Sequence, residues 1–288
     1  MDKLLKKIGA GFAAALVTFS PLALPTAGAE PAGNIVVLGD SYIANPDMTW
    51  NMLQTSAMSQ LIPKDVPYRQ GCVGSPDNFA THLANETGRP VDDWSCAGQT
   101  SRTLERRVED AIAAGDIRPD THAVTFGVGA NDFGFIGALD RLSRGQFDAE
   151  AMGREMNENI VRAVDRIRAI APEARIQLIG LPSVVDEGGN LCAINIIPND
   201  PGLLPNGLPI GSGMEDAIEL LQRSAAEAAR IDFIDMRSVS RQNSTCGTPD
   251  ELRQVAGVID TTSPSWRFMV HPTIVGSQVM ARESAARL

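Results

Sequence analysis

The sequence contains few of the residues that most metal and redox sites require. It has three histidines and four cysteines in 288 residues, and no two cysteines are spaced as a Cys-x-x-Cys pair. It also lacks the His-Glu-x-x-His helix of zinc peptidases and the Gly-x-Ser-x-Gly turn of α/β-hydrolases. These absences exclude a zinc finger, a thioredoxin-type redox pair and those two enzyme architectures, so we expect neither a metal nor a cofactor.

Long hydrophobic runs are absent after the first thirty residues. At the start, three lysines precede an apolar run over residues 8–24, and the small residues 27–29 follow it. This order is typical of a secretory signal peptide over residues 1–29, with cleavage expected near Ala29. An uncleaved membrane anchor is the alternative, but Pro21 interrupts the run, Pro25 follows it directly, and the run falls short of the roughly 20 apolar residues that span a bilayer. The sequence therefore predicts a secreted protein.

Basic side chains are in the minority. Without residues 1–29 the chain keeps 22 Lys and Arg against 34 Asp and Glu, a formal net charge of −12. Such a surface repels phosphate groups, so we expect no nucleic-acid binding, which needs Lys and Arg to displace counterions. The overall composition, 43% hydrophobic and 21% charged, is that of a globular protein. Because no linker composition follows, residues 30–288 are expected to form one domain.

The even cysteine count agrees with export. Cys72, Cys96, Cys192 and Cys246 are best explained as two disulfides, for which three pairings are open. We favour the sequential pairing, Cys72 with Cys96 and Cys192 with Cys246, because it closes local loops without crossing the chain. Each bond would stabilise the fold by about 3 kcal/mol through restriction of the unfolded chain.

Short apolar runs alternate with helical patterns along the chain. The runs predict buried strands at residues 35–38, 123–126, 176–179 and 231–234, with a weaker candidate at 91–94. Apolar residues at helical spacing predict helices between the strands, around 104–112 and 152–167, and further helices over 214–230 and after Pro272. This alternation predicts an α/β fold, a three-layer α/β/α sandwich with a central parallel sheet.

One segment interrupts this alternation. Residues 184–210 contain eight glycines and prolines, too many for regular structure. Loops of this length in a compact domain are usually functional or mobile. The apolar residues within 191–204 would be costly to expose unless they cover a pocket or meet a ligand.

Polar turns that contain glycine follow three of the predicted strands, at residues 39–41, 95–100 and 127–132. Ligands of open parallel sheets bind beyond the carboxyl ends of the strands, so these turns mark the candidate site. A serine hydroxyl there needs a neighbouring base to become a nucleophile.

The three histidines differ in their positions as candidate bases. His82 lies in a predicted helix and His122 directly before a buried strand, where structural roles are the commoner ones. His271 lies on a loop just before the final helix, beside the edge where the turns converge. It is therefore the candidate base.

Four short blocks occur in a characteristic order: Gly39-Asp40-Ser41, a lone Gly98, Gly129-Ala130-Asn131-Asp132 and His271-Pro272. Together they resemble the four blocks of the GDSL or SGNH hydrolase family, and they span nearly the whole chain after residue 30. The resemblance implies a flavodoxin-like version of the three-layer fold.

The resemblance also implies residue roles. Ser41 is the nucleophile and His271 the general base, while the backbone N–H groups of Ser41 and Gly98 and the side-chain amide of Asn131 form the oxyanion hole. Glycine allows a close backbone approach, and an amide donates without a change of protonation. We expect Asp40 and Asp132 to have local structural roles.

One position departs from the family pattern. The family usually has an acid three residues before the histidine, where this chain has Phe268. In this the chain is similar to secreted actinobacterial esterases of the family that orient the histidine with a backbone carbonyl. We therefore expect the Phe268 carbonyl to orient His271, with Asp260 as the rival orienting group.

These observations predict a secreted serine esterase or lipase that forms an acyl-serine intermediate. Segment 191–204 is expected to flank an acyl pocket, so lipid or fatty-acyl esters are the expected substrates, with transient contact with membrane or envelope lipid. We expect a monomer, with activity that rises through about pH 6 to 7 as His271 loses its proton. The alternatives are a carbohydrate O-deacetylase or acyltransferase of the envelope, and a non-catalytic envelope-binding protein.

Overall fold

The computed structural model describes residues 33–54, 56–133, 148–200 and 207–288. The expected signal peptide and part of the apolar segment 191–204 lie outside these residues. The chain divides into two units, Met1–Pro31 and Ala32–Leu288, and every element described below belongs to the second. Among the described residues, no helix has the length and apolar character needed to cross a bilayer.

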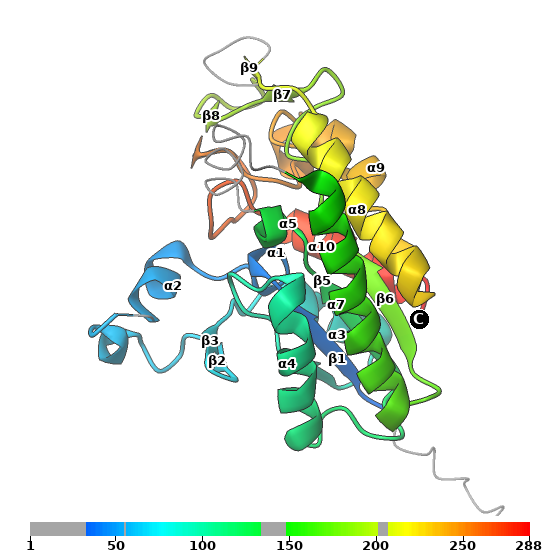
Figure 1. Ribbon diagram of the computed structural model, residues 1–288. Helices are drawn as coiled ribbons and strands as arrows, with labels where there is room; N and C mark the ends of the chain where they lie inside the picture. The colour runs from blue at the N-terminus through cyan, green and yellow to red at the C-terminus, as the bar shows by residue number, and fades with distance from the viewer. Residues whose placement is uncertain (1–32, 55, 134–147, 201–206) are drawn as a thin grey trace, which may run out of the picture. The chain divides into compact units, whose positions relative to one another are not determined.

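Five parallel strands form the central sheet, in the order β10-β6-β5-β1-β4 (Figure 1). Their bounds confirm the five predicted strands: β1 (Ile35–Gly39), β4 (Val91–Asp93), β5 (Ala123–Gly127), β6 (Arg175–Ile179) and β10 (Asp232–Ile234). Numbered along the chain, this order reads 2-1-3-4-5, which is the flavodoxin-like arrangement. The winding reverses between β1 and β5, and such a reversal is where these sheets bind their ligands.

Helices cover both faces of the sheet (Figure 1). On one face lie α4 (Ser101–Ala113), α7 (Ala149–Ile170) and α8 (Gly213–Ala229), and on the other lie α3 (Phe79–Thr87) and α10 (Ile274–Ala285). Alternate residues of β1 serve the two cores, since a strand points successive side chains to opposite faces. Val36 and Leu38 pack in the first core, and Ile35 and Val37 in the second. The predicted three-layer sandwich is confirmed.

Shorter elements connect these layers. The helices are α1 (Ser41–Ala44), α2 (Met48–Gln54), α5 (Ala130–Phe133) and α9 (Met236–Ser240), with 3₁₀ turns at Ser59–Leu61, Arg241–Asn243 and Asp250–Leu252. Two-residue strands pair as β2 (Tyr68–Arg69) with β3 (Cys72–Val73), β7 (Asn190–Leu191) with β9 (Leu208–Pro209), and β8 (Ile194–Asn195) with β11 (Ile259–Asp260). The described part of segment 184–210 is therefore held by short strand pairs.

Two disulfides fix the loops at the carboxyl edge. Cys72 pairs with Cys96 and Cys192 with Cys246, the sequential pairing that the sequence favours. The first bond holds the turn after β4, which carries Gly98, against β3. The second bond joins Cys192, just before β8, to Cys246, which follows α9.

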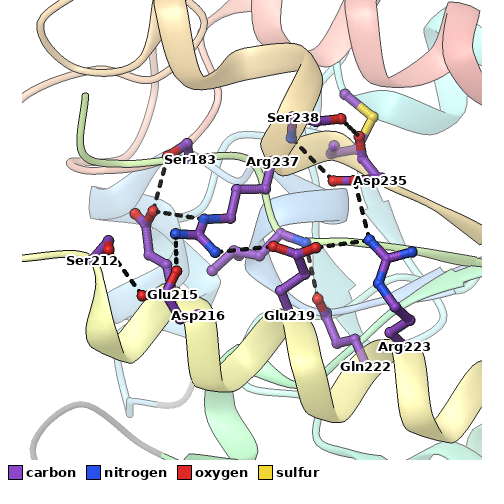
Figure 2. Close-up of polar contacts among 12 residues, drawn as sticks. Ser183, Ser212, Glu215, Asp216, Glu219, Gln222, Arg223, Asp235, Arg237 and Ser238 are labelled. Carbon is purple, nitrogen blue, oxygen red and sulfur yellow. Dashed lines mark hydrogen bonds and ion pairs between the residues drawn. The ribbon is translucent and has the colours of Figure 1, made fainter. Parts of the chain in front are cut away.

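An ion cluster around the buried Arg237 anchors the chain after β6 (Figure 2). The Arg237 guanidinium from α9 contacts Glu215, Asp216 and Glu219 from α8. Glu215 in turn accepts hydrogen bonds from the Ser183 hydroxyl at 2.8 Å and from the Val184 backbone N–H at 2.7 Å. Because buried charges are costly unless paired, this cluster fixes how α8, α9 and residues 183–185 fit together.

Candidate active site

Ser41 lies in a turn that only glycine at position 39 allows. Gly39 has a φ of +144°, and a Cβ there would stand 2.5 Å from the Ile43 side chain and 2.7 Å from the Gly127 carbonyl oxygen. The chain then turns directly from β1 into α1, whose first residue is Ser41. The Asp40 carboxylate accepts a hydrogen bond from the Tyr42 backbone N–H at 2.9 Å and caps the helix. This arrangement holds the Ser41 hydroxyl at the carboxyl edge of the sheet.

His271 reaches this edge from the far end of the chain. Its backbone carbonyl accepts a hydrogen bond from the Ala256 N–H at 3.0 Å, and Thr273 begins the turn into α10. The imidazole Nε2 lies 2.8 Å from Ser41 Oγ, although 230 residues separate the two. This distance is within the reach that proton transfer between a nucleophile and a base requires.

The group that orients the imidazole is the Met269 carbonyl, so the expectation for Phe268 is wrong. His271 Nδ1 lies 2.8 Å from the Met269 carbonyl oxygen. Val270 between them has a φ of +56°, a left-handed conformation that turns the chain back and presents the carbonyl two residues before the histidine. The Phe268 side chain instead packs its ring against the imidazole, with centroids 4.5 Å apart. A β-branched residue with positive φ is uncommon and strained, which places backbone strain beside the site.

Asp260, the rival orienting group, is engaged in its own loop. Its carboxylate accepts hydrogen bonds from the Gly257 N–H at 2.8 Å and from the Ser263 N–H and hydroxyl at 2.8 and 2.7 Å. It also lies beside the fully buried Arg253, at 3.8 Å. Asp260 therefore shapes the loop that runs beside His271 and does not hydrogen-bond the imidazole.

Burial controls the protonation of the site. It lowers the pKa of His271 to about 4, although the hydrogen bond to Met269 opposes the shift. Burial raises the pKa of Asp40 to about 7, helped by the nearby charge of Asp132 and opposed by the Tyr42 N–H. A general base must be neutral to accept a proton. With this pKa the His271 imidazole is already neutral at a pH well below 6 to 7, the range in which an unperturbed histidine loses its proton.

Hydrogen bonds join the turns that carry the other candidate residues. The Cys96 N–H donates to the Gly39 carbonyl at 2.8 Å, and the Asp40 N–H donates to the Gly127 carbonyl at 2.9 Å. The three turns that the sequence singles out thus meet at the switch point between β1 and β5. Gly98 has a φ of +83° with open space where a Cβ would stand, so a ligand can approach its backbone closely.

Asn131 is fixed by the turn that carries Gly98. Its Nδ2 donates to the Gln99 carbonyl at 3.0 Å, which leaves its second amide hydrogen for a ligand. The neighbouring Asp132 accepts from the Ser101 N–H at 3.0 Å and also from the Ser101 hydroxyl. Asp132 therefore has a structural contact here, as does Asp40 at its helix cap.

The comparisons with known proteins agree with this geometry. The model of the GDSL-like lipase/acylhydrolase family matches residues 37–279. The chain belongs to this family. A family match over this range covers all four blocks and confirms the resemblance, so the protein is a carboxylic ester hydrolase.

Individual proteins that resemble this chain differ strongly from it in sequence. An esterase from Streptomyces scabiei is 24% identical over 337 residues, covering 96% of this chain and 93% of that protein. Phospholipase A1 from Streptomyces albidoflavus superposes with a TM-score of 0.51 at 17% identity, covering 89% of this chain and 98% of that one. A lipase/acylhydrolase from Enterococcus faecalis gives 0.51 at 14% identity, covering 88% and 94%. These structures share the fold.

The remaining histidines occupy other parts of this GDSL-like domain. His82 lies in α3, and His122 lies directly before β5, at the opposite end of that strand from the candidate site. Sequence reasoning missed Met269 and Tyr42. Tyr42 follows Ser41 directly, and this adjacency of an aromatic ring to the candidate nucleophile is a signal that could have found it.

Proposed function

We propose that this protein is a secreted serine esterase in which Ser41 is the nucleophile and His271 the general base. The observation that carries the proposal is the 2.8 Å contact between Ser41 Oγ and His271 Nε2. The Met269 carbonyl holds Nδ1–H, so that Nε2 is free to accept a proton.

The reaction proceeds in two steps. Ser41 Oγ attacks the ester carbonyl carbon while its proton passes to His271 Nε2, and the departing alkoxide takes that proton and leaves as an alcohol. Water then attacks the acyl-serine, giving its proton to His271, which returns it to Ser41 Oγ as the carboxylic acid departs. Atoms and charge balance without a cofactor.

Three donors stabilise the oxyanion in this proposal: the backbone N–H groups of Ser41 and Gly98, and the free amide hydrogen of Asn131. The bonds that join their turns support this role, because donors fixed in advance stabilise the developing charge most effectively. Loss of one such donor typically costs about 3 kcal/mol of transition-state stabilisation.

The substrates we propose are acyl or lipid esters. Support comes from three adjoining segments beside His271: the Val258 and Ile259 N–H groups donate to the Ala193 carbonyl, and the Val270 N–H donates to the Gly257 carbonyl. On these segments Ile196 is 41% exposed and Ile259 56%, and Met269 is also exposed. Exposed apolar side chains that gather beside a site favour an apolar ligand, such as an acyl chain or a lipid surface.

Export supports the same function. The amino-terminal pattern of lysines, an apolar run and small residues is typical of a signal peptide, and two disulfides are typical of proteins outside the cytoplasm.

Covalent labelling tests the dyad. A fluorophosphonate probe is expected to modify Ser41 alone, located by mass spectrometry, and His271→Gln is expected to slow labelling by several orders of magnitude. A folded protein that stays unlabelled, or that is labelled elsewhere, would remove Ser41 from its role and favour the binding-protein alternative.

A chain-length series tests the substrate class. Nitrophenyl esters from acetyl to long acyl are expected to react faster as the chain grows, and Ile259→Ser should reduce that preference. Leu220→Ser is the matched control, because Leu220 is 68% exposed on α8. Highest rates on acetylated sugars would favour the O-deacetylase alternative.

A further inference from the structure

Two aromatic rings pack on the candidate base. The Tyr42 ring stacks on the His271 imidazole, with centroids 4.4 Å apart and planes 21° apart. The Phe268 ring packs on the same imidazole at 4.5 Å with planes tilted by 49°. One ring comes from the residue after Ser41, and the other occupies the position where the family usually has its acid.

Tyr42 also fixes the backbone that orients the base. Its hydroxyl donates a hydrogen bond of 2.9 Å to the Val270 carbonyl, next to the left-handed turn that presents the Met269 carbonyl. Burial, together with the charges of Asp40 and Glu215, raises the pKa of Tyr42 above its usual value. The hydroxyl therefore remains a donor throughout the working pH range.

No carboxylate contacts the imidazole in the part of the chain that the structure describes. Its hydrogen-bond partners are Ser41 Oγ and the Met269 carbonyl, both uncharged. On the element that carries Ser41, the ionisable groups are Tyr42 itself and Asp40, whose carboxylate accepts a hydrogen bond from the Tyr42 N–H. When His271 takes the serine proton, the buried imidazolium needs stabilisation from another source.

Aromatic faces can provide it. The face of a Tyr or Phe ring carries negative charge density and attracts a cation within about 6 Å of the centroid. Both rings lie inside this distance. The attraction acts on the imidazolium and is weak for the neutral imidazole, so it stabilises the state that forms as Oγ attacks.

We propose that Tyr42 and Phe268 are positioning residues that together replace the missing acid, holding the His271 ring in place and stabilising its imidazolium through their π faces. The proposal rests on the proposed function of Ser41 and His271. In the attack step, the proton moves from Ser41 Oγ to His271 Nε2. Nδ1 keeps its own proton, which it donates in a hydrogen bond to the Met269 carbonyl.

Leucine substitutions separate the rings' charge effect from simple burial. Leucine keeps the site apolar but has no π face, so Tyr42→Leu and Phe268→Leu should each lower kcat by about 5- to 30-fold with KM nearly unchanged. The acidic limb of the kcat profile should stay near pH 4 or move lower, because the imidazolium loses stabilisation. Phe268→Tyr and Tyr42→Phe, which keep the rings, should recover most of the rate.

The assay uses nitrophenyl butyrate with active sites counted by fluorophosphonate titration, so that unfolded protein does not enter kcat. Tyr68→Leu is the control, since Tyr68 is exposed on β2. Should Tyr42→Leu not fold, Phe268→Leu decides the test, because Phe268 is only half-buried.

Two results would overturn the proposal. The first is a leucine variant that keeps more than a third of the wild-type kcat. The second is an acidic limb that rises towards pH 6.5, which would mean that the rings merely exclude water. Ser41→Ala, assayed on the same ester with total protein measured by absorbance because this variant has no hydroxyl to titrate, distinguishes the failures: if it remains active, the proposed function itself is wrong, and if it is inactive, only the role of the rings is rejected.

Discussion

Arg237 and His271 are both buried, at 6% and 9% exposure, but their surroundings differ in charge. Three carboxylates surround the Arg237 guanidinium (Figure 2). The His271 imidazole meets a hydroxyl, a carbonyl and two aromatic rings. One site holds a permanent charge that three carboxylates compensate, and the other holds a neutral group that forms no ion pair with the described residues.

This difference in charge distinguishes a buried polar group that stabilises the fold from one that can take part in chemistry. A compensated charge is locked in one state, so the Arg237 cluster can hold helices and loops together but cannot exchange protons at working pH. A neutral imidazole whose pKa lies near 4 can accept a proton briefly and return it. Substitutions should therefore damage stability at one site and turnover at the other.

The largest expected effect is on turnover at the uncharged site. His271→Gln removes the base and should lower kcat by about 10⁴-fold. At pH 7 the imidazole is neutral in the folded and the unfolded chain and has no ion pair among the described residues, so the urea midpoint there should fall far less than in a variant that breaks the Arg237 cluster. A variant that keeps a hundredth or more of wild-type turnover would exclude His271 as the general base.

Breaking the charged cluster should mainly affect stability. Arg237→Met leaves the buried Glu215 carboxylate without its cation and should lower the free energy of unfolding by about 3 to 5 kcal/mol. Arg154→Met is the matched control, since its pair with Glu150 is exposed and should contribute about 0.5 kcal/mol or less. Urea unfolding measures both, and kcat per titrated site at low temperature should survive in Arg237→Met. Equal losses of unfolding free energy in Arg237→Met and Arg154→Met would show that the Arg237 cluster stabilises the fold no more than an exposed ion pair does.

The pH dependence of stability should show two opposing contributions at the site. His271 has a folded pKa of about 4, below the usual 6.5, so its contribution to stability is complete above pH 6.5 and is lost as the pH falls towards 4. Asp40 has a folded pKa of about 7, above the usual 3.8, so its contribution is complete below pH 3.8 and is lost as the pH rises through 7. Across these ranges, titration changes the free energy of unfolding by about 3 kcal/mol through His271 and about 4 kcal/mol through Asp40.

Single substitutions should separate the two contributions. Relative to wild type, His271→Gln should lose stability as the pH rises from 4 to 7, while Asp40→Asn should gain it over the same range. Urea unfolding at four pH values between 4.5 and 7.5 measures the slopes. Slopes parallel to that of wild type in both variants would show that neither group titrates as the geometry implies.

The smallest expected effect concerns Asp260. Asp260→Asn turns part of an acceptor into a donor against the Gly257 and Ser263 N–H groups, and should cost about 1 to 3 kcal/mol of stability. Because Asp260 does not contact His271, kcat should fall by less than tenfold. A thousandfold loss with an unchanged fold would restore Asp260 as the orienting group.

Local patterns predicted most of the sheet. Apolar runs such as residues 35–38 and 123–126 are buried on both faces, and their residue types alone specify that environment. Ser41, Gly98 and Asn131 lie in turns that follow three parallel strands. Because the carboxyl ends of parallel strands lie at the same edge of a sheet, these residues were predicted to lie at one edge. These features depend on neighbours in the sequence.

The orienting carbonyl could not be predicted in the same way. Whether Phe268 or Met269 faces the imidazole depends on the φ of Val270, and a β-branched residue gives no sign that it adopts a left-handed conformation. The Arg237 cluster was equally hidden, since Arg237 and Glu215 are 22 residues apart and meet only once α8 and α9 have packed. Contacts of this kind follow from tertiary structure.

The bonds between the second and third turns have a further consequence. Asn131 donates a hydrogen bond to the Gln99 carbonyl, and Asp132 accepts one from the Ser101 N–H. The spacing between Gly98 and Asn131, the donors we propose for the oxyanion, is thus set by bonds within the protein. If these two residues serve as proposed, selectivity among esters depends on the surrounding loops, and exchanging those loops should change the preferred ester while leaving the Gly98–Asn131 spacing intact.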